Sequence, residues 1–198
     1  MVESLSTRLE GRIVVLEPLR PEHADLLWPV ARDPEVWRWM IVRADRDEAV
    51  FHGWIEEALT RAGEAREAPF AVLSAETGEP LGSTRYTALR PEHRGVEVGY
   101  TWLAREAWGT GANTEAKLLL LEHAFERAGC IRVEFKTDAR NERARRALEA
   151  LPARFEGIFR KHMVVRDGEL RDSAWYAITD DEWPAVRANL ERRLEPRR

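Results

Sequence analysis

The chain has 198 residues, of which 44% are hydrophobic and 33% charged, with a formal net charge of −4 and one cysteine, Cys130. This composition is typical of a globular protein, and the length fits a single domain over residues 1–198. The lack of an apolar run of roughly 18 residues argues against a membrane partner, the net charge gives no reason to expect nucleic acid, and a lone cysteine without a secretory signal indicates the cytoplasm.

Strand and helix patterns mix in the first half of the chain. β-Branched runs indicate strands, and a helical spacing of apolar residues indicates helices. Two of the strands flank a turn at Thr77–Pro80, which predicts a hairpin. The predicted elements are a strand at Arg12–Leu19, helices at Glu22–Arg32 and Asp47–Ala62, and strands at Phe70–Ser74 and Leu81–Tyr86.

A strand–helix–strand unit is predicted at residues 96–137. In the strand Val96–Leu103, alternation predicts that Val96, Val98, Tyr100 and Trp102 share one face and Glu97, Gly99 and Thr101 the other. The remaining predicted elements are a helix at Asn113–Arg127 ended by Gly129, a strand at Ile131–Thr137, a helix at Glu142–Leu151, two strands around Asp167–Gly168 and a helix from Asp180. This order predicts a mixed α/β sheet.

The loop that enters the central helix carries the clearest chemical signal. It contains Gly109 and Gly111, and glycines can adopt positive φ and let backbone approach a ligand closely. The first N–H groups of a helix have no partner inside the helix, and with the helix dipole they form an anion site. The segment Trp108–Glu115 therefore predicts a loop that holds a pyrophosphate. A tight turn capped by Asn113 is the structural alternative.

Two other phosphate-binding loops fit less well. A P-loop requires Lys followed by Ser or Thr after the last glycine, and this chain has none there. A dinucleotide-binding loop requires a third glycine where Thr114 stands, although Glu134 lies roughly 20 residues further on, as that fingerprint asks. The dinucleotide interpretation stays open as the weaker alternative.

The sequence resembles the GNAT superfamily of N-acetyltransferases, in particular its ribosomal-protein-alanine acetyltransferase-like branch. The resemblance spans nearly the whole chain, in matching order. It rests on Glu97–Leu103, Trp108–Ala116, Asp138–Ala144, Arg171–Tyr176 and Glu182–Pro184.

The resemblance implies an α/β (α+β) fold: a mixed, mostly antiparallel central sheet of about seven strands, splayed between the fourth and fifth and flanked by helices. It implies acetyl-CoA as co-substrate. Backbone N–H groups of the entry loop would bind the pyrophosphate, the edge of the preceding strand would pair with pantetheine, and an N–H near Thr101 or Trp102 would polarise the thioester carbonyl. The implied binding residues are Thr101, Trp102, Leu103, Trp108, Gly109, Thr110, Gly111, Ala112, Asn113, Thr114 and Asn141.

The catalytic groups are less well defined. Many relatives place a tyrosine acid where this chain has Leu148, and some use a serine where it has Ala144. Glu97 is the candidate general base, acting through water, and Asp138 is the second candidate. Each carboxylate also has a structural interpretation, as an ion-paired or a capping residue.

These expectations define an N-acetyltransferase that works by direct attack in a ternary complex, with the α-amine of a peptide or protein as leading acceptor. A small-molecule amine (polyamine, aminoglycoside or amino acid) stays open as acceptor, and a catalytically silent acyl-CoA-binding module is the alternative from another class. The five histidines do not cluster at ligand spacing, so we expect no metal. Relatives often pair, which admits a homodimer.

Overall fold

The computed structural model describes residues 5–195 and is built around one eight-stranded sheet with the order β1-β2-β3-β4-β5-β6-β8-β7. Every neighbouring pair is antiparallel except β5 and β6. The α/β fold with a mostly antiparallel sheet is therefore confirmed. Its strands are β1 Leu9–Glu10, β2 Val14–Pro18, β3 Ala68–Ser74, β4 Pro80–Arg90, β5 Gly95–Leu103, β6 Arg132–Asp138, β7 Arg154–Val165 and β8 Glu169–Thr179. The two-residue β1 is the strand that the sequence did not predict.

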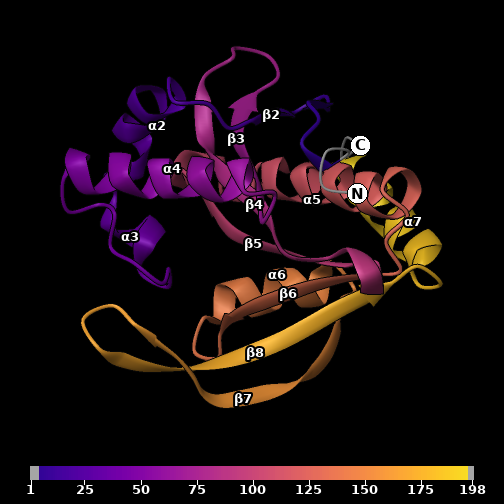
Figure 1. Ribbon diagram of the computed structural model, residues 1–198. Helices are drawn as coiled ribbons and strands as arrows, with labels where there is room; N and C mark the ends of the chain where they lie inside the picture. The colour runs from indigo at the N-terminus through magenta and orange to yellow at the C-terminus, as the bar shows by residue number, and fades with distance from the viewer. Residues whose placement is uncertain (1–4, 196–198) are drawn as a thin grey trace.

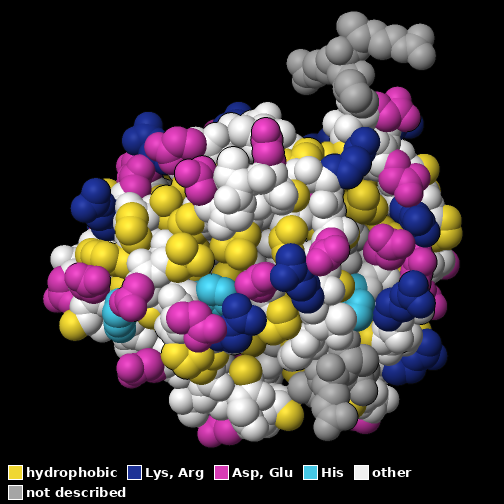
Figure 2. Space-filling view, turned by 90° about the horizontal axis from the view of Figure 1, so that it is seen from above, with side chains coloured by type: hydrophobic (Ala, Val, Ile, Leu, Met, Phe, Trp, Pro, Cys, Tyr) yellow, Lys and Arg dark blue, Asp and Glu magenta, His cyan; other side chains and the backbone are white. Residues whose placement is uncertain are grey.

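Helices cover the sheet from both sides (Figure 1). Alternate residues of β3 divide between two hydrophobic clusters, so the clusters lie on opposite faces of the sheet. One cluster, on what we call the α5 face, includes residues of α5 Ala112–Glu122, α6 Glu142–Ala150 and α7 Trp183–Leu194. The other, on the α4 face, includes residues of α2 His23–Ala31, α3 Pro34–Trp37 and α4 Glu48–Gly63. Acidic and basic side chains are intermixed over the surface that Figure 2 shows from above.

Among the described residues, the sheet has one parallel pair of strands, and this pair shares fewer paired residues than its neighbours in the centre of the sheet. β5 and β6 pair over Gly95–Glu97 and Arg132–Glu134, and this register ends at Glu97. The strands diverge from that point, as the resemblance implies. With β1 counted, they are the fifth and sixth strands of the chain.

A β-bulge in β5 overturns one prediction about this strand. Arg85 pairs with Gly99 and Ser83 with Trp102, so one residue of β4 faces both Tyr100 and Thr101. Tyr100 has a φ of 49°. The bulge inverts the alternation, because Val96 and Val98 join the cluster on the α5 face, whereas Tyr100 and Trp102 pack on the α4 face. The predicted common face for these four residues is wrong.

Glu115 fixes the first turn of α5 against the edge of β2. Its side chain is buried, and its carboxylate accepts hydrogen bonds from the backbone N–H groups of Arg12, Ile13 and Val14 at 3.0, 2.6 and 2.7 Å. A carboxylate in the first helical turn also interacts favourably with the helix dipole. This contact positions the loop that enters α5.

We predict that Glu115→Ala lowers the free energy of unfolding by about 3 kcal/mol or more, because it leaves three N–H groups without their acceptor. Urea denaturation measures the loss. The matched control is Glu76→Ala at an exposed position, which should change the free energy by no more than about 0.5 kcal/mol. Equal effects of the two substitutions would contradict the anchoring role.

Candidate active site

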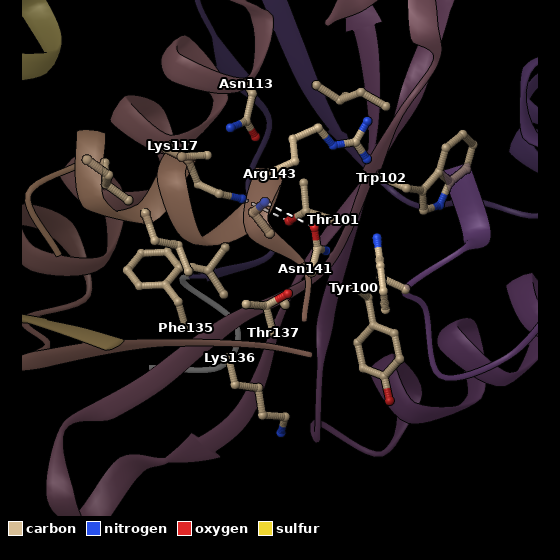
Figure 3. A pocket seen from close by; sticks show the side chains of 18 of the residues that line it. Tyr100, Thr101, Trp102, Asn113, Lys117, Phe135, Lys136, Thr137, Asn141 and Arg143 are labelled. Carbon is tan, nitrogen blue, oxygen red and sulfur yellow. Dashed lines mark hydrogen bonds between the residues drawn. The ribbon is translucent and has the colours of Figure 1, made fainter. Parts of the chain in front are cut away.

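A cavity of about 400 Å³ occupies the space where β5 and β6 diverge. It reaches from the first turn of α5 to the ends of β5 and β6, and residues of four helices (α3, α5, α6 and α7) and of strands β4 to β8 line it. Figure 3 shows ten of the lining residues by name. Of the sequence-predicted residues, it is lined by Glu97, Thr101, Trp102, Leu103, Trp108, Gly109, Asn113, Thr114 and Asn141, and not by Thr110, Gly111, Ala112 or Asp138.

The loop into α5 leaves backbone amides unpaired at one end of the cavity. Gly109 has a φ of 78°, and nothing lies within 4 Å of where its Cβ would stand. Gly111, at 96°, caps the helix, and a Cβ there would lie 3.0 Å from Ile13. Among the described residues, no acceptor bonds the N–H groups of Gly109, Asn113 or Thr114. The N–H of Ala112 is 3.3 Å from the Thr110 hydroxyl, so this amide is already partly satisfied.

Two arginines that the sequence did not single out add positive charge at this end. Arg143 stacks over the ring of Trp108 at 3.5 Å from its centroid, and Trp108 in turn donates to the Leu103 carbonyl. Arg193 on α7 lies 3.5 Å from the Thr114 hydroxyl. Both arginines line the cavity. A site with unpaired amides, a helix N-terminus and two guanidinium groups is chemically suited to phosphate.

Asn141 lies on the opposite wall. Its Oδ1 accepts a hydrogen bond from the N–H of Ala144 at 3.1 Å, so it is the N-cap of α6. The side chain is buried and borders the cavity, and none of the described residues accepts a hydrogen bond from its Nδ2. Capping and ligand binding are therefore compatible, because they use different atoms of the same amide.

Glu97 stands at the last pair before β5 and β6 separate. It is 2% exposed, and its Oε2 lies 2.9 Å from Nζ of Lys136. Burial raises the pKa of Glu97, and the Lys136 ammonium opposes this shift. A buried carboxylate of raised pKa beside a cavity is suited to accepting a proton.

Asp138, the second predicted base, lies outside the cavity lining. Its carboxylate is fully buried and accepts hydrogen bonds from Arg140, and Nη2 of Arg166 lies 3.5 Å away. Burial by itself would raise the pKa of Asp138, but the hydrogen bonds from Arg140 outweigh it and lower the pKa. This arrangement is that of a structural ion pair at the turn after β6.

Lys117 is a further candidate for a functional residue, and it lies in the apolar stretch of the helix predicted at Asn113–Arg127. It projects from α5 into the cavity and donates to Oγ1 of Thr101 at 2.8 Å (Figure 3). The Thr101 hydroxyl also bonds Oγ1 of Thr84. No described carboxylate forms an ion pair with Lys117, and burial lowers the pKa of Lys117 to about 7. The site thus holds an amine that can be charged or neutral near pH 7.

Comparison with known proteins places the chain in a class of transferases. Residues 14–154 match the family model described as "Acetyltransferase (GNAT) domain". A presumed acetyltransferase from T. thermophilus is 42% identical, with a TM-score of 0.86 over 95% of this chain and 97% of that one. A GCN5-related N-acetyltransferase from Brucella melitensis is 31% identical, with a TM-score of 0.89 over 96% and 86% of the two chains.

The chain belongs to the GNAT acetyltransferase family, and that family implies acetyl-CoA as co-substrate. The N-acetyltransferase p20 of Bacillus licheniformis, itself uncharacterised, is 26% identical over 86% of this chain and 94% of its own. The ribosomal L7/L12 alpha-N-protein acetyltransferase RimL shares the fold at 15% identity and a TM-score of 0.76 over 87% and 94% of the two chains. No helix within residues 5–195 is long and apolar enough to cross a membrane.

We predict a pH-dependent contribution of Lys117 to stability. Between about pH 7 and 10.5 the unfolded chain binds a proton at this amine and the folded chain does not, so the free energy of unfolding rises with pH in this window. Relative to Lys117→Met, the free energy of unfolding of the wild type should increase by several kcal/mol across this pH window, with about 5 kcal/mol as the limit. Urea denaturation at a series of pH values measures the difference.

The exposed Lys161 provides the control for this series, because Lys161→Met should leave the pH dependence of the wild type intact. A Lys117→Met protein with the same pH dependence as the wild type would show that the buried amine keeps its ordinary pKa.

Proposed function

We propose that this acetyltransferase moves the acetyl group of acetyl-CoA to a primary α-amine, with the N-terminal amine of a peptide or protein as the leading acceptor. One observation carries the proposal. The same cavity that begins at the unpaired amides of α5 ends at the buried carboxylate of Glu97. A thioester held by its phosphates at one end would therefore meet a proton acceptor at the other.

The residues present fit acetyl-CoA. The N–H groups of Gly109, Asn113 and Thr114 have no acceptor among the described residues and lie at a helix N-terminus, where a diphosphate binds favourably. The two arginines at this end, Arg143 and Arg193, add charge for phosphate oxygens. Asn141 and the free edge of β5 border the space that pantetheine would take, and a backbone N–H near Thr101 or Trp102 would polarise the thioester carbonyl.

Acetyl-CoA supplies a thioester carbon for attack and a thiolate as leaving group. The attacking nitrogen must lose a proton and the thiolate must gain one. Glu97, through a water molecule, accepts the first proton. Nζ of Lys117 carries the proton for the thiolate. The two cavity positions where relatives place an acid are Leu148 and Ala144 in this chain, and neither can donate a proton. Proton loss and gain then balance, because Glu97 afterwards releases its proton to solvent and Lys117 takes one up from solvent.

The acceptor class follows from the protonation state of amines. Only a neutral amine attacks a thioester. At pH 7 a lysine with its ordinary pKa is neutral in roughly one molecule in 2,500, whereas an α-amine is neutral in roughly a tenth or more. A site whose base is a single carboxylate suits the weaker amine. RimL, whose name describes an alpha-N-protein acetyltransferase, shares this fold.

Two alternatives make different predictions. A small-molecule amine would replace the peptide without any change in the acetyl-CoA site. A silent acyl-CoA-binding module would bind the thioester and never release thiol, and the presence of Lys117 in the cavity argues against it. Release of free thiol from acetyl-CoA, measured with panels of peptides and small amines, separates all three.

We predict that Gly109→Ala weakens acetyl-CoA binding at least tenfold, because the new Cβ enters open space beside the unpaired amides. The matched control is Gly78→Ala in the β3–β4 turn, where φ is 73° and the Cβ also meets nothing within 4 Å. Both substitutions should destabilise the fold by about 1 kcal/mol, since both force alanine into the left-handed region.

Calorimetric titration with acetyl-CoA and with free CoA distinguishes the two variants. Equal affinities of Gly109→Ala and Gly78→Ala would remove the loop from the binding site. Stabilisation by NAD and not by CoA would favour the dinucleotide alternative.

We predict that Glu97→Gln lowers kcat/KM about a hundredfold at neutral pH, the usual scale for a general base. The ratio of wild-type to variant activity should fall as the pH drops through the raised pKa of Glu97, because the wild type then loses its base. Taking the ratio cancels the titration of the acceptor amine itself.

The control is Glu134→Gln on β6. Glu134 is the register partner of Glu97, but it bonds Arg90 and Arg132 and does not line the cavity. Its variant should keep the pH profile of the wild type. A Glu97→Gln enzyme with unchanged kcat/KM at every pH would contradict the assigned base.

A further inference from the structure

The end of the cavity away from α5 contains a guanidinium group without a described partner. Arg171 on β8 is 4% exposed and lines the cavity. None of the described residues forms a hydrogen bond or an ion pair with it, and its Nε is buried without any acceptor. Arginine stays protonated in proteins, so this is a buried positive charge.

The carboxylates nearest to this charge are already paired. Glu97 is held by Lys136 at 2.9 Å, and Asp138 by Arg140 at 2.7 Å. Around the turn after β6, Glu169 binds Arg140 and Arg166 at 2.7 and 2.9 Å. Four cations, Lys136, Arg140, Arg166 and Arg171, therefore share three carboxylates, and Arg171 is the cation left over.

Such a charge is costly unless something neutralises it. Burial lowers the pKa of Arg171, and Asp138 only partly opposes this shift. Removing one partner of a buried ion pair is strongly destabilising, because it leaves an uncompensated charge in the interior. A structure that keeps such a charge beside an open cavity is suited to an anion that arrives from outside.

Arg171 is placed on the acceptor side of the sheet. Its register partner is Met163, and it lies two residues before Ser173, which pairs with the last residue of β6. Alternation along β8 puts it on the same face as Trp175, over whose ring Lys136 lies. Arg171 thus faces the same part of the cavity as the ion pair of Glu97 and Lys136.

The cavity walls around Arg171 are mostly apolar. Trp39, Met40 and Ile41 line the cavity from the segment after α3, and Tyr100 and Met163 complete this part. The segment after α3 is tied to the β7–β8 hairpin, because Arg166 donates to the carbonyls of Met40 and Ile41. A pocket with few and separated polar groups selects ligands by the positions of their charges.

We propose that Arg171 binds a carboxylate of the acceptor, so that the acetylated amine belongs to a molecule with a carboxylate close to that amine. This inference rests on the proposed function and narrows its acceptor class. The planar guanidinium matches a carboxylate with two parallel hydrogen bonds. Glu97 and Arg171 form no ion pair with each other, so the amine can lie at Glu97 while the carboxylate lies at Arg171.

Two kinds of molecule present this chemistry. A free α-amino acid carries its own α-carboxylate, and a peptide that begins with Asp or Glu carries a side-chain carboxylate. Two pairs of acceptors separate these sources: leucine against leucinamide, and a peptide beginning with Asp against the same peptide beginning with Asn. The wild type should prefer the carboxylate member of at least one pair by about tenfold or more in kcat/KM.

Arg171→Met should lower kcat/KM for the preferred carboxylate acceptor about a hundredfold and leave its neutral counterpart within about threefold. The loss should fall mainly on KM, as expected for a group that binds acceptor and does not handle protons. Arg171→Lys, which keeps the charge and loses the paired geometry, should recover part of the preference. The control is Arg160→Met, an exposed arginine on β7 outside the cavity lining.

A binding measurement tests Arg171 without turnover. Thermal shifts of the CoA-loaded protein with each acceptor should show stabilisation by the carboxylate member only, and Arg171→Met should abolish it. Equal shifts for both members of each pair, or an Arg171→Met loss that is the same for all acceptors, would overturn the inference. Failure of the proposed function has a different signature, since no amine of either pair would then release thiol while the shifts could still discriminate.

Discussion

The divergence of β5 and β6 is the constraint on which the rest of the site depends. Their pairing ends at Glu97 and Glu134. Beyond these residues each strand stays paired with its other neighbour, β5 with β4 and β6 with β8. The bulge at Tyr100 contributes to the same opening, because it returns Thr101 to the α5 face while Trp102 packs with α4. The opening joins the two faces of the sheet, so a ligand held by α5 can meet one that enters from the α4 side.

The position of the loop that enters α5 depends on a separate contact. The carboxylate of Glu115 accepts hydrogen bonds from the backbone at the start of β2, and Gly111 lies close to Ile13, which a Cβ at this position would approach to 3.0 Å. The first turn of α5 is therefore fixed from behind, while the amides of Asn113 and Thr114 have no described acceptor in front. This arrangement is preorganised, since an anion would find the donors already in place and the loop would lose little conformational freedom on binding.

Local signals in the sequence predicted the fold and one end of the site, and tertiary contacts decided the rest. Glycines before an apolar helix predict an anion loop wherever they occur, and alternation placed β5 and β6. The face of Tyr100 was predicted wrongly, because a non-glycine residue at positive φ has no sequence signal. In the sequence, Lys117 is one polar residue in an apolar helix, and Arg171 is one in a strand. They become functional candidates because no described carboxylate bonds to either of them in the fold. The sequence does not show this, because the surroundings of each side chain come from residues far away in the chain.

Lys117 and Arg171, two cations of the cavity without a described carboxylate partner, are chemically suited to different tasks. Lys117 lies on the side of α5, where burial brings its pKa to about 7, so its ammonium can give up a proton during a reaction near neutral pH. Arg171 lies on β8 beside the same cavity, and a guanidinium does not give up its proton there. A lysine at the position of Arg171 would lack the planar group that forms two parallel hydrogen bonds with a carboxylate, while an arginine at the position of Lys117 could not donate its proton to a thiolate. The choice of cation at each end thus agrees with proton transfer at the thioester and with binding at the acceptor.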